Sequence, residues 1–242
     1  MPNRFAGLSR ISDPCPCDHY LGDLDGSSPP FAIHTDAQDT SGEAWRRLLA
    51  LIEEAADEGH EEFTPGAALP EEMWEQVVTL PPSIAKLDSV KKMTLYGSNL
   101  ISIPPEIGEM KSLTEFHPYT STRLHWFPYE ITQCPALRDS TVSTRIIYGN
   151  FKYRMPFPTL PTAVPAGSTP SCCSVCHRPI SPAGAIQVWI SLPVGSDVLP
   201  LLVHACSEDC INALPPTPEG YVDGPHRGGP DVVQPGALML GG

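Results

Sequence analysis

Leu80-Pro81-Pro82-Ser83-Ile84 begins a stretch in which one short sequence occurs almost three times. It returns as Ile103-Pro104-Pro105-Glu106-Ile107 after 23 residues, and as Phe127-Pro128-Tyr129-Glu130-Ile131 after 24 more. Apolar residues keep the same spacing behind each copy: Leu87, Met110 and Cys134, then Val90, Leu113 and Leu137, with Met93 and Phe116 between them. A fixed period of this length predicts a solenoid, in which each repeat buries its apolar face against its neighbours.

The best copy fits the pattern L-x-x-L-x-L-x-x-N-x-L with Val90, Met93, Leu95, Ser98 and Leu100. The stretch therefore resembles the leucine-rich repeat, in the short I-P-x-x-I form of uncharacterised bacterial proteins. Ser98 departs from the family, which has Asn or Cys there, and the third copy is degenerate after Leu137. The resemblance implies a short solenoid over residues 80–154. A chance spacing of Pro-Pro pairs in an ordinary α/β domain is the alternative.

The expected fold class is α+β: a leucine-rich-repeat solenoid capped by N-terminal helices, plus a small zinc-stabilised hairpin-helix module. Residues 1–38 form an irregular segment, and residues 39–79 a helical cap with helices over about 41–58 and 70–78. The cap would cover the apolar end and the sheet edge of the first repeat. Beyond the repeats we expect a Pro-rich linker (155–170), the zinc-binding module (171–214) and a Pro/Gly-rich tail (215–242).

Charge and composition exclude several classes of partner. The formal net charge is −13, and the first 79 residues hold 16 acidic and 4 basic side chains. We expect no nucleic acid partner, because phosphate binding needs clustered Lys and Arg. No apolar run approaches the length of a membrane span and no signal peptide is evident, so we expect a cytoplasmic protein without a membrane partner. Eight Cys without an export signal favour metal ligands or free thiols over disulfides.

Each repeat predicts a short β-strand whose side chains alternate between the core and an exposed concave face. Because solenoids commonly bind on this face, it is the expected site for a protein partner. A segment rich in aromatic residues, 119–129, adds residue types that are enriched in binding hot spots. The predicted partner-binding residues are Lys92, Thr94, Tyr96, Glu115, His117, Tyr119, Arg123, Asp139 and Thr141. The alternative is that these are ordinary solvated strand residues.

Two cysteine pairs predict a metal site. Cys173-x-x-Cys176 is followed, after 29 residues, by Cys206-x-x-x-Cys210, and four thiolates at these spacings fit one tetrahedral Zn ion. A predicted hairpin lies between the pairs, and Ser207 can cap a short helix behind it. This arrangement resembles a treble-clef zinc finger, which implies a structural site. The alternatives are free thiols or a disulfide, or an open site in which His177, His204 or Cys172 replaces one ligand.

A second group, Cys15-Pro16-Cys17-Asp18-His19, could join a metal site, but it lacks a second ligand pair, so exposed thiols are the favoured interpretation. No nucleophile motif, phosphate loop or dinucleotide fingerprint is present. The leading functional hypothesis is therefore a non-catalytic protein-interaction module with a structural zinc site. One alternative is a zinc-dependent enzyme with three Cys ligands and His177 or His204 as the acid–base group. Another is a secreted bacterial effector that acts on a host protein.

Overall fold

The computed structural model describes residues 33–142, 148–150, 156–161 and 170–236. Its α-helices are α1 (Glu43–Asp57), α2 (Pro65–Ala68), α3 (Glu71–Trp74) and α4 (Glu208–Asn212). Short 3-10 helices are η2 (Pro82–Lys86), η3 (Pro105–Glu109), η4 (Tyr129–Gln133) and η6 (Pro182–Gly184). The strands are β1 (Glu62–Phe63), β2 (Lys92–Thr94), β3 (Glu115–His117), β4 (Phe127–Pro128), β5 (Asp139–Ser140), β6 (Ile186–Val194) and β7 (Asp197–Ala205).

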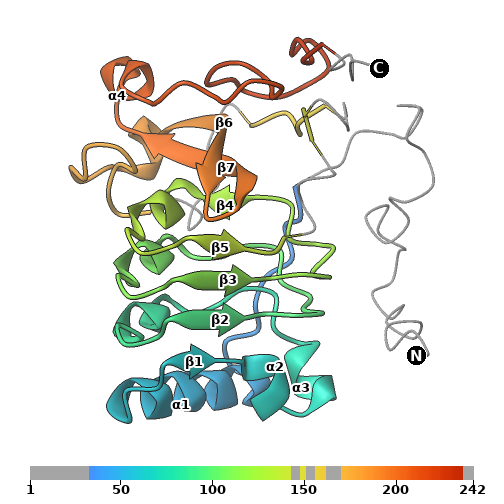
Figure 1. Ribbon diagram of the computed structural model, residues 1–242, viewed down its shortest axis with the longest axis vertical. Helices are drawn as coiled ribbons and strands as arrows, with labels where there is room; N and C mark the ends of the chain where they lie inside the picture. The colour runs from blue at the N-terminus through green and yellow to red at the C-terminus, as the bar shows by residue number, and fades with distance from the viewer. Residues whose placement is uncertain (1–32, 143–147, 151–155, 162–169, 237–242) are drawn as a thin grey trace.

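The first sheet is parallel and has the strand order β1-β2-β3-β5 (Figure 1). Lys92 pairs with Glu115, and Glu115 pairs with Asp139, so the strand register reproduces the 23- and 24-residue spacings of the sequence. Each copy supplies a 3-10 helix, and in the first two copies a Pro near the first helical position fits the dihedral angles there. Each copy of the sequence repeat therefore forms a helical turn that is followed by a short strand.

The second sheet is mixed and has the order β4-β7-β6. Strands β6 and β7 form an antiparallel hairpin over their whole length, from Ile186 opposite Ala205 to Val194 opposite Asp197. Strand β4 joins them in parallel, with Phe127 opposite Leu201. One strand of the third sequence copy thus belongs to the same sheet as the hairpin.

The predicted fold class, a short leucine-rich-repeat solenoid with a small zinc-stabilised module attached, is wrong. The described residues form an α+β fold with two small sheets, one parallel with four strands and one mixed with three, and few helices. The physical reason lies in the third copy, where Phe127–Pro128 pairs with β7. The hairpin then buries its apolar residues in the same core as the repeats.

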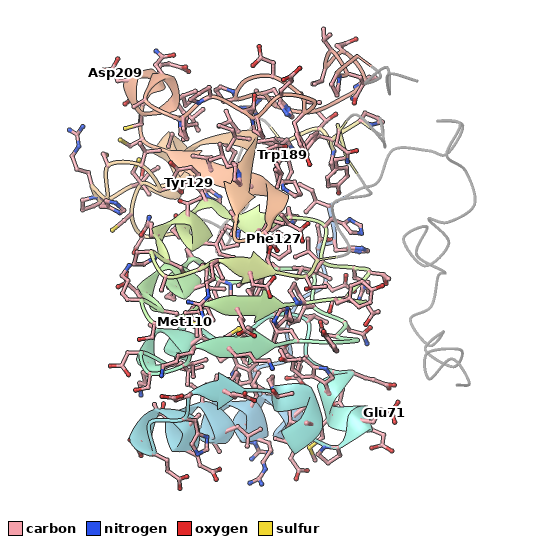
Figure 2. All side chains as sticks on the ribbon, in the orientation of Figure 1. Glu71, Met110, Phe127, Tyr129, Trp189 and Asp209 are labelled. Atoms are coloured by element: carbon pink, nitrogen blue, oxygen red, sulfur yellow. The ribbon has the colours of Figure 1, made fainter. Side chains whose placement is uncertain are left out.

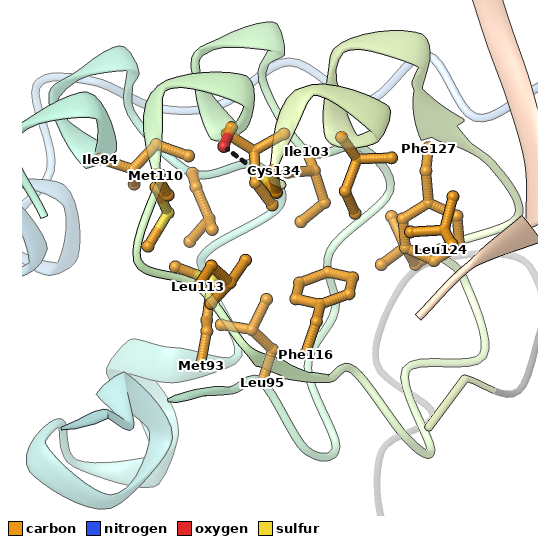
Figure 3. Packing of buried hydrophobic residues seen from close by; sticks show 14 of the residues in the cluster. Ile84, Met93, Leu95, Ile103, Met110, Leu113, Phe116, Leu124, Phe127 and Cys134 are labelled. Carbon is orange, nitrogen blue, oxygen red and sulfur yellow. Dashed lines mark hydrogen bonds between the residues drawn. The ribbon is translucent and has the colours of Figure 1, made fainter. Parts of the chain in front are cut away.

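The main core fills the space between the 3-10 helices and the parallel sheet (Figure 3). Side chains of the helical turns, such as Ile84 and Met110, face those of the strands, such as Met93 and Phe116, and all four are fully buried. The Cys134 thiol donates to the Ile107 carbonyl at 3.1 Å across neighbouring turns. Buried hairpin residues, including Ile190 and Val203, belong to the same cluster. At roughly 1.5–3 kcal/mol for each large apolar side chain, this shared burial is the largest stabilising contribution in the structure.

The outer edge of the parallel sheet, at β5, is covered by the β6–β7 turn. Ser140 donates its backbone N–H to the Ser196 hydroxyl at 3.0 Å and its own hydroxyl to the Val194 carbonyl at 2.9 Å. The Asp197 N–H in turn donates to the Ser140 hydroxyl at 3.2 Å. Because an open strand edge can pair with another chain, these bonds also protect the sheet.

An extended segment before α1 runs along the side of the stacked turns (Figure 1). The Gln38 amide oxygen accepts the Val78 N–H at 2.8 Å, and the Gln38 amide nitrogen donates to the Gln76 carbonyl at 3.3 Å. Further along, Asp36 forms a 2.7 Å ion pair with Arg123. The segment therefore ties the helical end of the molecule to the loop that precedes β4.

The described part of the C-terminal segment, predicted as a tail, lies against the hairpin. His226 and Trp189 exchange two backbone hydrogen bonds of 2.7 and 3.0 Å, which covers the free edge of β6. The Arg227 guanidinium donates to the Pro161 carbonyl at 2.7 Å. Sequence periodicity could not indicate that this segment packs against the hairpin, because a single β-bridge and a few loop hydrogen bonds leave no repeating pattern.

The N-terminal helices are close to the prediction in type and shorter in extent. Helix α1 covers most of the expected helix. Gly42 is its N-cap, and the Asp39 carboxylate accepts hydrogen bonds from the Ser41 N–H and hydroxyl just before it. Helix α3 ends at Trp74, well before the predicted end, and α2 lies at a position where no helix was predicted. Among the described residues, no helix combines the length and apolar character needed to cross a membrane.

Gly195 provides a test of the hairpin docking. Its φ of +61° lies in the left-handed region, and an added Cβ would meet the Asp139 carbonyl carbon at 3.0 Å. We expect Gly195→Ala to lower the free energy of unfolding by about 1–3 kcal/mol, from backbone strain and crowding. Gly184→Ala is the matched control, because its Cβ would meet only the Ser181 hydroxyl at 3.4 Å. Equal unfolding free energies for both variants, measured by urea denaturation, would contradict the docking.

His226 predicts a loss of stability in acid. Burial lowers its pKa from 6.5 to about 4, and its Nδ1 accepts the Gly228 N–H at 3.1 Å, which requires the neutral ring. The unfolded chain therefore binds more protons than the folded chain between these pH values, so stability falls as the pH drops from 6.5 towards 4. The slope from one such group is at most about 1.4 kcal/mol per pH unit. Denaturation curves would be measured at several pH values across this range. The free energy of unfolding should fall less for His226→Gln than for wild type, and an identical fall would show that His226 does not cause the loss.

Candidate metal centre and candidate partner surface

The sulfur atoms of Cys173, Cys176, Cys206 and Cys210 lie within 4.8 Å of one another. The Cys176 and Cys206 sulfurs are 3.5 Å apart, and those of Cys206 and Cys210 are 3.6 Å apart. All four are free thiols, Cys173 and Cys210 are buried, and the other two are half-buried. The structure thus brings together the four predicted ligands in a cluster that could hold a metal ion.

Local backbone bonds place each pair. The His177 N–H donates to the Cys173 carbonyl at 3.0 Å, and the Cys173 N–H donates to the Arg178 carbonyl at 2.8 Å, which closes a tight loop around the first pair. His177 adopts a φ of 58° to make this turn. In the second pair, the Ser207 hydroxyl caps α4 by accepting the Cys210 N–H, as the sequence predicted.

The loop of the first pair is attached to the rest of the fold at Ser174. Its N–H donates to the His204 carbonyl at 2.9 Å, and its hydroxyl accepts the His204 N–H at 3.0 Å. From η4, the Gln133 side chain donates to the Ser174 carbonyl at 3.5 Å. The loop is therefore fixed both to β7 and to the last helical turn of the repeats.

The neighbouring cysteines of the cluster differ in how easily they ionise. Hydrogen bonds from the Arg178 backbone and side chain lower the pKa of Cys176 to about 6. Hydrogen bonds to the neighbouring Cys176 and Cys210 sulfurs raise the pKa of Cys206 to about 12, and charge repulsion from Cys173 adds to this rise. A bound cation would remove this repulsion and favour thiolates at all four positions.

The side chains proposed as substitute ligands are not members of this group, which contains four sulfurs and no imidazole. His204 is buried, its Nε2 lies 2.8 Å from the Gln187 amide nitrogen, and burial lowers its pKa to about 4. His177 and Cys172 are exposed. The other candidate group, Cys15, Cys17 and His19, lies outside the described residues.

Eight of the nine predicted partner-binding residues lie on or beside the parallel sheet. Lys92, Glu115 and Asp139 stand opposite one another across β2, β3 and β5, and Thr94 stands opposite His117. Thr141, just past β5, has its hydroxyl 3.2 Å from the His117 Nδ1. The rings of Tyr96 and Tyr119 are 52% and 45% exposed and meet edge to face, with centroids 6.1 Å apart. These eight residues are called the sheet face below.

Arg123 lies elsewhere. Its side chain is buried with only 6% exposed, and it pairs with Asp36 of the N-terminal segment at 2.7 Å. The Arg123 guanidinium is therefore engaged in a contact within the fold and is not exposed on the sheet. No local sequence signal links Asp36 to Arg123, since the two are 87 residues apart.

In Figure 2, Asp209 of α4 marks the end of the molecule that carries the cysteine cluster, and Glu71 of α3 marks the opposite end. The chain matches no model of a known protein family, and it matches no curated protein sequence. The resemblance to leucine-rich repeats and to treble-clef fingers therefore stays a prediction.

Substitution of single cysteines tests the cluster. We expect Cys173→Ser and Cys210→Ser to lose bound metal and to lower the melting temperature, because each removes one of the four ligands and with it part of the binding free energy that stabilises the fold. Metal content would be measured by elemental analysis after gel filtration. Cys172→Ser is the matched control, since this neighbouring thiol is exposed and outside the cluster. Metal retained in both cluster variants, or lost equally in Cys172→Ser, would contradict the assignment.

Proposed function

We propose that this chain is a non-catalytic protein-binding module that uses the sheet face and carries a structural zinc ion. The observation that carries the proposal is the exposed tyrosine pair beside a row of charged residues. Tyr96 and Tyr119 leave about half of their surface in solvent, whereas the other large apolar side chains of the described residues, Val233 apart, are more buried. Tyr combines a rigid apolar ring with a hydrogen-bonding tip and is enriched in binding hot spots.

The surface around the tyrosines is suited to recognising a protein. Three β-strands hold its side chains in register, so little conformational entropy would be lost on binding. Lys92 contributes a positive charge, and Glu115 and Asp139 contribute negative ones in the same row. Charges in a fixed order give selectivity, because a partner must present the complementary order.

Zinc is the ion that fits the cluster best. Four thiolates form a soft ligand set that Zn accepts in a closed tetrahedral site, and such a site stabilises a fold without an open position for substrate. Two of its ligands come from the loop before β6, one from the link between β7 and α4, and one from α4 itself. The zinc ion would therefore fasten the open end of the hairpin. Elemental analysis of the purified chain should give about one zinc per chain, and iron or no metal would refute this identity.

A photo-crosslinking experiment tests the binding face. A photoreactive phenylalanine analogue would replace Tyr96 or Tyr119 in the full chain expressed in its native cell. If the sheet face is the binding site, both positions should give the same crosslinked protein species, which mass spectrometry would identify.

Val233 is the control position, because it is 85% exposed and belongs to the C-terminal segment. A species formed at Tyr96 and Tyr119 but absent at Val233 supports the proposal. Crosslinks that are equal at all three positions, or absent from both tyrosine positions, would exclude the sheet face as the site.

A further inference from the structure

Glu115, His117 and Asp139 form a second group of metal-ligating side chains, separate from the cysteines. One donor atom from each lies within 4.8 Å of the other two. The His117 Nε2 is 3.4 Å from a Glu115 carboxylate oxygen. The group combines an imidazole with two carboxylates, so it offers the mixed nitrogen and oxygen donors found in sites for first-row transition metals.

The strand geometry explains why these three donors converge. Glu115 and His117 are two residues apart on β3, so their side chains emerge on the same face of the sheet. Asp139 stands directly opposite Glu115 on β5. Two donors at alternate positions of one strand and a third on the adjacent strand enclose one point above the sheet. No loop needs to move to bring them together.

The imidazole is held in place from its other side. Its relative exposure is 9%, and its Nδ1 lies 3.2 Å from the Thr141 hydroxyl. A bond from Nδ1–H to Thr141 leaves the Nε2 lone pair directed towards the Glu115 carboxylate. Such a second bond is the usual way in which a metal-binding histidine is oriented. Asp139 is likewise held, because the Ser196 hydroxyl is 3.1 Å from its Oδ1.

The charges at this point are unbalanced. Two carboxylates directly opposite each other on neighbouring strands repel and destabilise a sheet. Lys92 is next in the row, but no ion pair within 4.0 Å joins it to Glu115 among the ion pairs of the described residues. A divalent cation between the carboxylates would convert this repulsion into attraction.

We propose that Glu115, His117 and Asp139 bind a divalent transition-metal ion on the sheet face. Glu115 and Asp139 supply carboxylate oxygens and His117 supplies Nε2. Three protein ligands leave further coordination positions open to water or to a donor group of a bound molecule. The Glu115 side chain is 36% exposed, so an ion can reach the site from solvent.

Manganese is a suitable probe, because carboxylates bind Mn²⁺ well whereas soft thiolates favour other metals. The full chain, purified with its cysteine cluster loaded with zinc, would be titrated with Mn²⁺ while electron paramagnetic resonance reports the free ion. We expect one Mn²⁺ per chain. Glu115→Gln and Asp139→Asn should each weaken binding by at least about tenfold, since even the loss of an outer hydrogen-bond partner costs roughly 10–100-fold.

Two variants in the same row complete the design. Glu62 of β1 pairs with Lys92 on the side away from the proposed site. The control variant Glu62→Gln therefore removes a negative charge without removing a ligand, and it should leave the Mn²⁺ affinity unchanged. Lys92→Gln should tighten binding, because it removes a positive charge next to Glu115. Circular dichroism would confirm that each variant is folded.

The proposal is overturned if the wild-type chain binds no Mn²⁺ even when the added Mn²⁺ reaches millimolar concentration. It is also overturned if Glu62→Gln weakens binding as much as Asp139→Asn. Binding that persists in both ligand variants would also overturn it. The titration uses the chain alone and needs no protein partner. It therefore succeeds or fails independently of the crosslinking test of the sheet face.

Discussion

The contact between Ser140 and the β6–β7 turn is the interaction on which the two sheets depend. Ser140 occupies a position where a regular repeat would place an apolar residue, and it is buried with 4% exposed. A buried hydroxyl without a partner would cost free energy, yet Ser140 bonds to Val194, Ser196 and Asp197 of the turn. The degenerate third copy is thus the position where the hairpin docks.

The hairpin is held at both of its ends. Its turn is fixed to β5 by these bonds, and its open end leads into the four cysteines and the Ser174 contacts with His204. Between the two ends, β7 pairs with β4 and buries Leu201 against the repeat core. Because the same nine-residue strands reach from the cysteine cluster to the parallel sheet, loosening one end would release contacts at the other.

The sequence predicted those features whose signal is local or periodic. The strand positions at Met93 and Phe116, the close approach of the four cysteines and the Ser207 cap follow from spacing and from residue chemistry, and the structure has them where expected. The overall architecture was predicted wrongly, because the pairing of Phe127 with Leu201 joins residues 74 positions apart and leaves no pattern in either segment. Arg123 was misplaced for the same reason, since its burial depends on the distant Asp36.

The sheet face and the cysteine cluster are connected through one side chain. The Ser196 hydroxyl lies within hydrogen-bond distance of both the Ser140 carbonyl and the Asp139 carboxylate. Asp139 is therefore oriented by the hairpin turn, and the far end of the hairpin leads into the cysteine cluster. A metal ion in the cysteine cluster would thus act on the sheet face without contacting it, because it restricts the element that positions Asp139. A rigid scaffold behind a row of charged side chains lowers the conformational entropy lost when a ligand binds that row.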